Sequence, residues 1–216
     1  MKNKILFVVL VLLIFFFHAC FQKSTKIELG KFNQNKYVNE QFDLLIEVPE
    51  NYFFLDQNQR RSLSKTNMES IIEDKEQVEY SLKKSALIFT IFKFNPDTII
   101  EVNPNITITA TNISGLPELE DSSSAVQEAM SALKEMNKRF VFDNQTFEFE
   151  INDKKYTGFN SSITVDDMTA NYSSFMGNFD NFNLTITISF KNEKQKSELL
   201  KIIKNIKPTK NNGYSN

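Results

Sequence analysis

Apolar and polar residues alternate along much of the chain, as they do in β-strands with one buried face. In residues 42–48 the apolar side chains fall on alternate positions, and Pro49 ends the run because proline cannot donate to a β-ladder. The same alternation predicts further strands at 105–113, 147–151 and 183–190. Residues 85–95 are apolar on both faces, which predicts a strand in the middle of a sheet that is covered on both sides.

Three stretches have apolar residues three or four positions apart, which predicts amphipathic helices. Thr66 and Glu69 have the spacing of a capping box, so a helix is expected to begin at Thr66. Residues 122–140 give the clearest helical pattern, with Ser124 as the expected N-cap. Near the end of the chain Asn192 is a suitable N-cap, and it is followed by an apolar stripe of Leu199, Ile202, Ile203 and Ile206.

The order of these elements indicates the fold class. Two more strands are expected at 154–165 and 169–177, joined by a turn at Asp166 and Asp167. Short turns join consecutive strands, so the strands should pair antiparallel, and a strand that is apolar on both faces needs helices on both sides. The sequence therefore predicts a single α+β domain, a mainly antiparallel sheet with helices on both faces in an α/β/α sandwich.

The domain boundaries follow from the polar stretches at each end. Residues 39–207 hold all the predicted elements and form the expected domain. Residues 20–38 are mostly polar and are expected to be a tether, with room for one short strand. Residues 208–216 are expected to form a flexible polar tail.

The first residues have the composition of an export signal. A basic start is followed by an unbroken apolar run from 5 to 17, which is shorter than the roughly 20 residues that a transmembrane helix needs. The run ends in the letters HAC, with Ala19 just before Cys20. This resembles a bacterial lipoprotein signal, although Phe17 and His18 depart from its usual residues. The alternative is an ordinary secretory signal that is cut nearby.

The resemblance implies how the mature chain is held in the cell envelope. Residues 1–19 would be removed as the signal peptide, and Cys20 would carry lipid, including palmitate, as a membrane anchor. Some bacteria send lipoproteins to the outer surface with an acidic run after the cysteine, which is missing here. The expected location is therefore the periplasmic side of the outer membrane.

Composition limits the chemistry that the mature chain can carry out. His18 is the only histidine and Cys20 the only cysteine, so beyond the signal there is no Ser-His-Asp triad, no Cys-His pair and no disulfide. Zinc and iron sites usually draw on these residues, and the five glycines are too scattered for a phosphate-binding loop, so no metal or cofactor is expected. Loss of Lys2 and Lys4 leaves 23 basic against 27 acidic residues, about −4, which argues against nucleic acid as a partner.

Several phrases resemble the PsbP-like superfamily, which includes an extrinsic photosystem subunit, a Ran-binding nuclear import factor and small bacterial lipoproteins. These phrases are FDLLIEVPENY, NITITATNIS, KKYTGFNSS and NLTITISFKNEKQKSELLKIIKNIK, and the likeness spans residues 39–207. Where the family usually has Trp after the opening Pro, this chain has Tyr52 or Phe53. The resemblance implies a non-catalytic binding or assembly role with a protein partner, and it supplies no site residues.

Two functional hypotheses remain. The first is a binding or assembly module whose partner surface includes the aromatic residues of 171–183, namely Tyr172, Phe175, Phe179 and Phe182. Against that surface stands the simpler interpretation that these side chains belong to the core of a hairpin. The second hypothesis is a carboxylate-based hydrolase or small-ligand carrier, which requires a pocket between sheet and helix with two convergent acidic side chains.

Overall fold

The computed structural model describes residues 26–69, 72, 74–116, 119, 121–136, 139–143 and 145–209. The helices are α2 (Gln57–Glu69), α3 (Lys75–Lys84), α4 (Ser122–Met136) and α5 (Glu193–Lys204). The strands are β1 (Lys31–Asn33), β2 (Lys36–Asn39), β3 (Leu44–Glu47), β4 (Phe53–Phe54), β5 (Ser85–Phe92), β6 (Asn105–Asn112), β7 (Phe140–Phe142), β8 (Phe147–Ile151), β9 (Lys154–Val165), β10 (Met168–Phe179) and β11 (Phe182–Phe190).

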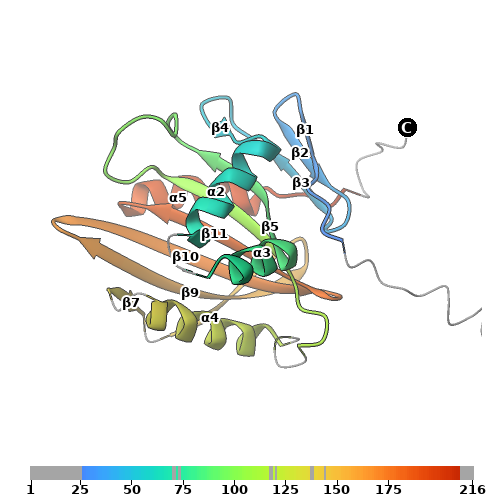
Figure 1. Cartoon of the computed structure of the whole chain (residues 1–216). Coiled ribbons are helices and arrows are strands. Elements are labelled where there is room, and N and C mark those ends of the chain that lie inside the picture. Colours follow the sequence, from blue (N-terminus) through green and yellow to red (C-terminus); the bar gives the residue numbers. More distant parts are fainter. Residues whose placement is uncertain are drawn as a thin grey trace, which may run out of the picture.

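The strands form one large sheet and one small one (Figure 1). The large sheet has eight strands in the order β4-β5-β6-β11-β10-β9-β7, and β8 also pairs with β9. The small sheet has the order β1-β2-β3. All the strand pairs in both sheets are antiparallel. The predicted α+β class and its antiparallel sheet are confirmed.

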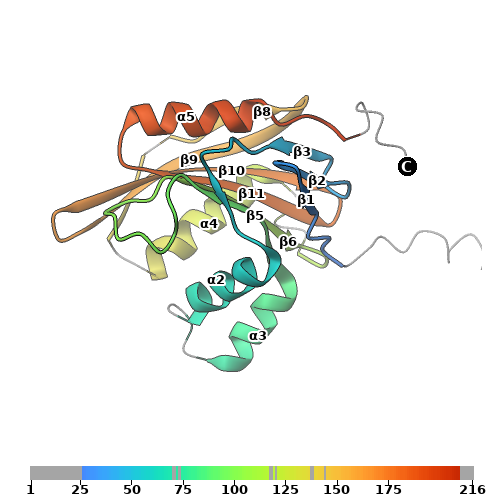
Figure 2. The same ribbon diagram turned by 90° about the horizontal axis from the view of Figure 1, so that it is seen from above.

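Helices cover both faces of the large sheet, as predicted (Figure 2). Helix α5 lies on one face, which we call the α5 face, and the small sheet lies beside it on that side. Helices α2, α3 and α4 lie on the opposite face. The main core fills the α5 face and unites Ile186, Ile188, Leu199 and Ile203, all 0% exposed, while a smaller cluster lies beneath α4.

Two helices begin at different residues from those predicted. Thr66 lies inside α2, and the true capping box is made by Asp56 and Gln59, each of which accepts the backbone N–H of the other. Ser124 lies inside α4, where its N–H donates to the carboxylate of Asp121. In both cases an aspartate upstream is the better cap because its charge also suits the helix dipole. Asn192 caps α5 as predicted.

Strand β5 is not in the middle of the sheet as predicted. Only the two-residue β4 lies beyond it, and the central position belongs to β11. Its apolar residues are nevertheless covered on both sides, because α2 and α3 pack on one face and Tyr37 of β2 contacts Phe89 on the other, with ring centroids 5.0 Å apart.

The folded part begins before residue 39, within the expected tether. Residues 31–39 form the hairpin of β1 and β2, whose turn residues Gln34 and Asn35 have positive φ angles of 48° and 59°. Tyr37 of this hairpin is 0% exposed and belongs to the main core. The sequence did not predict this hairpin, because its apolar residues are few and Tyr37 is its main contact with the core.

Candidate functional site

A polar groove lies on the α5 face of the large sheet, beside the N-terminus of α5. It consists of two cavities of about 530 and 330 Å³ that share Asp143 and Asn160 in their linings. We call it the Asn160 groove. Amide, hydroxyl and charged side chains provide most of its lining, among them Gln145, Thr146, Ser162, Asn171, Glu193 and Lys196.

Strand register places these residues on the same face as the core. Asn160 pairs with Ser173, and Ser173 pairs with Ile188 of the main core. Side chains of directly opposed residues point to the same side of a sheet, so all three point toward the layer of α5. The groove is therefore a polar continuation of the surface on which α5 packs.

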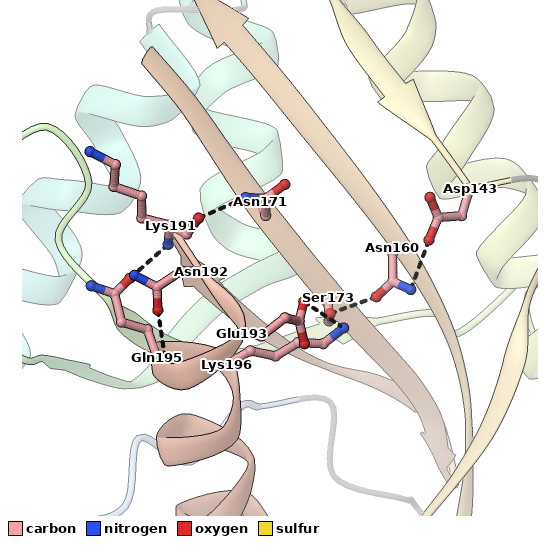
Figure 3. A network of polar contacts seen from close by, with 9 residues as sticks. All are labelled: Asp143, Asn160, Asn171, Ser173, Lys191, Asn192, Glu193, Gln195 and Lys196. Atoms are coloured by element: carbon pink, nitrogen blue, oxygen red, sulfur yellow. Dashed lines mark hydrogen bonds and ion pairs between the residues drawn. The ribbon is translucent and has the colours of Figure 1, made fainter.

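A row of hydrogen bonds fixes the amide of Asn160 at the centre of the groove (Figure 3). The hydroxyl of Ser173, which is 0% exposed, donates to Asn160 Oδ1 at 2.6 Å, and Asn160 Nδ2 donates to Asp143 Oδ2 at 3.0 Å. Ser173 lies in β10, Asn160 in β9, and Asp143 directly after β7. Adjacent strands thus hold the three side chains, and the two bonds determine which way the amide faces.

The first turn of α5 is fixed to the sheet at the other side of the groove. Asn192 Oδ1 accepts the N–H of Gln195 at 3.1 Å, and Gln195 Oε1 accepts the N–H of Lys191 at 2.7 Å (Figure 3). Asn171 Nδ2 then donates to the carbonyl of Lys191 at 3.3 Å, which links β10 to the start of the helix. The Lys191 ammonium pairs with Glu101. Both walls of the groove are therefore held by hydrogen bonds or ion pairs.

The charges around the groove leave a small negative excess. Asp143 and Glu193 supply two carboxylates and Lys196 supplies one ammonium group, because the Lys191 ammonium is already paired with Glu101. Lys196 Nζ lies 4.0 Å from Glu193 Oε1 and 5.4 Å from the centroid of the Phe190 ring, so this cation is held by both a carboxylate and an aromatic face. A small negative excess of charge disfavours anionic ligands.

The buried hydroxyl of the groove is not activated as a nucleophile. Ser173 is the buried hydroxyl of the network, and its proton points at an amide oxygen, which is too weak a base to activate it. Asn160 presents one amide N–H beyond the bond to Asp143, and Asp143 presents Oδ1. No partner for these two groups occurs within the described part of the chain, so they are available to a ligand or to water.

A second cleft of about 600 Å³ lies between α5 and the small sheet, where the hydrolase or carrier hypothesis would place its pocket. Burial raises the pKa of its Tyr52 to about 12, helped by the negative charge of Glu198. Two of its three carboxylates are paired with lysines, Glu198 with Lys93 at 3.4 Å and Glu47 with Lys207 at 3.1 Å, and the third, Glu50, is exposed. These pairings do not favour the pair of acids that this hypothesis requires.

The four aromatic residues proposed as a partner surface do not form one. Phe175 and Phe182 are 1% and 4% exposed and belong to the main core, where Phe179 also packs. Tyr172 pairs with Ser189 and points to the opposite face of the sheet, and burial raises its pKa. The reason is the strand period of two, which divides a run of aromatics between two faces. The structure has the simpler arrangement, a hairpin with aromatic core residues.

Three further features bear on the predictions from the sequence: the lipid attachment residue, metal ligation and membrane-spanning helices. Cys20, the expected lipid attachment residue, and the signal peptide fall outside the described residues. Within residues 26–209 as described, no group of three or more Asp, Glu, His or Cys side chains could hold a metal ion. No helix in the described part is both long enough and apolar enough to cross a membrane.

Sequence reasoning missed the residues of the Asn160 groove. Asn160 and Ser173 looked like ordinary polar positions in the strands 154–165 and 169–177. One signal was available in the sequence. Ser173 and Asn171 lie two and four positions before the apolar Phe175, so they share its strand face, where polar residues are unexpected unless they form hydrogen bonds. That signal points to a network only when the register between β9 and β10 is known.

Comparison with known proteins identifies the fold. The sequence matches no protein-family model and no curated protein. The structure is similar to the solution structure of cyanobacterial PsbP (CyanoP) from Synechocystis sp. PCC 6803, with a TM-score of 0.51, 9% sequence identity, and coverage of 83% of this chain and 98% of that one. The fold is therefore PsbP-like. At this identity the likeness concerns the fold alone.

Two other solved structures have lower scores. LpqN of Mycobacterium tuberculosis, described as involved in cell envelope biogenesis, has a TM-score of 0.44 and 12% identity and covers 76% of this chain and 83% of its own. A protein of unknown function from Pseudomonas aeruginosa has a TM-score of 0.44 and 7% identity and covers 55% of this chain and 81% of its own.

Proposed function

We propose that this chain is a lipid-anchored, non-catalytic binding module that presents one end of its large sheet to a protein partner. We call this the distal end; it comprises the loop 93–104, the β9–β10 turn, β7 and the start of α5. These segments lie together on the side away from the termini in Figure 1.

Exposed apolar side chains at the distal end are the observation that carries the proposal. Ile99 is fully exposed, Val141 is 64% exposed and Met168 is 42% exposed. Val141 lies beside the Asn160 groove, because it pairs directly with Ser162 of its lining, and the loop that carries Ile99 reaches the same end through the pair of Glu101 with Lys191. Apolar patches with polar surroundings are typical of protein interaction sites.

Hydrogen bonds close the base of the loop 93–104, whose apolar residues Ile99 and Ile100 face solvent. Asn103 Oδ1 accepts the N–H of Phe94 at 3.1 Å, and Asn103 Nδ2 donates to the Phe94 carbonyl at 2.9 Å. Lys93 N–H donates to the carbonyl of Pro104 at 2.8 Å and closes the base of the loop. A loop that is already ordered loses less entropy when a partner binds, which favours a docking role for Ile99.

Both ends of the described chain meet at the opposite side of the molecule. The carbonyl of Lys26 accepts Gln41 Nε2 at 3.0 Å, and Thr209 N–H donates to Asp43 Oδ1 at 2.8 Å. Residues 40–43 form the turn before β3, so this turn fixes the point where the chain leaves the domain. A lipid on Cys20 would leave the distal end facing away from the membrane, within reach of a partner. We place the anchored chain on the periplasmic side of the outer membrane, because an acidic run after Cys20 is missing.

Site-specific photo-crosslinking tests the docking surface. A photoreactive residue at Ile99 or Val141 should give a discrete crosslinked product in cells of the source organism. The matched control is Tyr80 of α3, which is 62% exposed and lies outside the distal end. Equal products from position 80, or none from positions 99 and 141, would contradict the docking surface.

Metabolic labelling tests the anchor separately. Cells that express the full chain are fed an alkyne analogue of palmitate, and the wild type is compared with Cys20→Ala. The wild type should be labelled and sediment with outer membranes, whereas the variant should lose the label. A label retained by Cys20→Ala would refute attachment at this residue without affecting the crosslinking result.

A further inference from the structure

We propose that the Asn160 groove is a second binding site, which takes a neutral polyhydroxylated ligand such as a stretch of glycan. This inference concerns different groups from the apolar side chains of the proposed docking surface. It rests on the hydrogen-bonding pattern, the small net charge and the strand pairing of the groove.

The centre of the groove offers a donor and an acceptor side by side. One N–H of Asn160 Nδ2 is directed to Asp143 Oδ2 at 3.0 Å, so the second N–H and Asp143 Oδ1 flank this bond. Adjacent hydroxyls on a sugar ring can accept from such an N–H and donate to such a carboxylate at the same time. The Asp143 carboxylate only accepts, so it keeps the amide N–H on its side and leaves Asn160 Oδ1 toward the Ser173 hydroxyl at 2.6 Å.

The lining beyond the centre continues the same chemistry. Gln145 and Thr146 line the cavity toward β8, and Ser162 and Asn171 line the cavity toward α5. These side chains donate and accept without a net charge, as hydroxyl groups require. The carboxylates of Asp143 and Glu193 against the single ammonium of Lys196 make a phosphate a poor match. The ring of Phe147 at one end supplies an apolar surface for the C–H face of a sugar.

Strand pairing disfavours an extended peptide as the occupant. A peptide commonly binds a sheet by adding a strand to an open edge, where main-chain groups supply the affinity. Along the groove the outer edge of β9 is already occupied, because β7 pairs with residues 161–163 and β8 with residues 154–158. The groove therefore offers side-chain groups, which suit a ligand whose own polar groups are hydroxyls.

Titration of the full chain with neutral tetrasaccharides tests the inference. The probes are the β-1,4-linked tetramers of glucose and of N-acetylglucosamine and the α-1,4-linked tetramer of glucose, added to isotopically labelled chain in a detergent without a sugar headgroup. At least one probe should give saturable NMR shifts of the side-chain amides of Asn160 and Asn171, at concentrations up to about 10 mM, well above the millimolar Kd of a weak complex. An uncharged peptide of mixed sequence serves as the competing ligand.

Variants separate the groove from the rest of the surface. Asp143 is exposed, so Asp143→Asn should keep the fold while it weakens the saccharide about tenfold through loss of a charge-assisted hydrogen bond. Asn160→Ala should weaken it at least as much. The matched control is Asn183→Ala, which removes an amide hydrogen-bonded to Asn178 on the opposite face of the sheet, and its affinity should equal that of the wild type.

Three results would overturn the inference. The first is that no tetrasaccharide gives saturable shifts in the groove. The second is that Asp143→Asn binds as tightly as the wild type, which would place the ligand elsewhere. The third is that the peptide, and no saccharide, shifts Asn160 and Asn171.

Discussion

The α5 face of the large sheet has two ends made by the same strands but with opposite chemistry. At one end Phe175 of β10 pairs with Ile186 of β11, and both are at most 1% exposed. One row further, Ser173 pairs with Asn160, and the polar Asn160 groove begins. Strand β11 remains apolar through both rows because α5 packs over it, whereas β9 and β10 become polar beyond the helix. Whether α5 packs on a strand position therefore determines whether the residue there is apolar or polar.

The largest difference between the two ends should appear in stability. Ile186→Ala removes a side chain that is 0% exposed and leaves a cavity under α5, so we expect a loss of about 2–5 kcal/mol in the free energy of unfolding. Asn171→Ala in the groove removes one hydrogen bond, to the carbonyl of Lys191, and should cost about 1 kcal/mol or less. Urea denaturation of both variants measures the comparison. Equal losses would mean that the groove is as important to the fold as the core is.

Gly158 lies at the boundary between the two ends and sharpens the comparison. A Cβ at this position would lie 2.5 Å from the nearest atom of the Phe147 ring, so Gly158→Ala must displace a ring that lines the groove. The expected cost is about 1–3 kcal/mol, as for other overpacked sites. Urea denaturation measures the loss of stability, and the NMR shift of the Asn160 side-chain amide reports the displacement of the Phe147 ring.

Gly177→Ala is the matched control for this substitution. Its Cβ would lie 2.8 Å from the ring of Tyr156, within the apolar end. It should lower stability by a similar amount but leave the Asn160 amide unchanged. If both glycine variants shift the Asn160 amide resonance equally, the polar and apolar ends respond as one unit, and Gly158 does not mark a boundary between them.

The fold class followed from the sequence because periodicity reports burial directly. Strands β6, β8 and β11 and helix α5 have one apolar face each, and their ranges agree with the prediction to within about two residues, the usual uncertainty of such boundaries. The position of β5 did not follow, because residues 85–95 are apolar on both faces through coverage by α2, α3 and the small sheet, not through a central place. Hydrophobic pattern alone does not distinguish these two causes.

The candidate site could not be predicted from the sequence in the same way. The Asn160 network depends on the register of β9 against β10, which brings Asn160 opposite Ser173 although they are 13 positions apart. The predicted aromatic surface, which includes Phe175, rests on residue type, and residue type does not report the face of a strand. The network depends on how the strands pair in the folded sheet, and hydrophobic periodicity along the sequence carries no information about that pairing.

The apolar end should also be the more sensitive to high pH. Burial raises the pKa of Tyr156 well above its ordinary value of 10, so the native state retains a proton that the unfolded chain loses. Stability from this group is complete below pH 10 and declines as the pH rises toward the native pKa, by up to about 1.4 kcal/mol per pH unit. Tyr156→Phe should therefore lose less stability than the wild type above pH 10. Parallel pH profiles of the two proteins in urea denaturation would contradict the prediction.

The smallest expected effect belongs to the buried hydroxyl that joins the two ends. Ser173→Ala removes the bond to Asn160 Oδ1 and should cost about 1 kcal/mol, because the half-buried amide can turn to water instead. The more specific consequence is local: without this donor only the bond to Asp143 orients the amide, so its two N–H resonances should move and broaden while the backbone of β10 is unchanged. The control is Ser174→Ala. The Ser174 hydroxyl lies on the opposite face of the sheet, where it hydrogen-bonds to Thr187, so its removal should leave the Asn160 amide unchanged. If Ser173→Ala also leaves that amide unchanged, then the bond to Asp143 and the strands orient it without the buried hydroxyl.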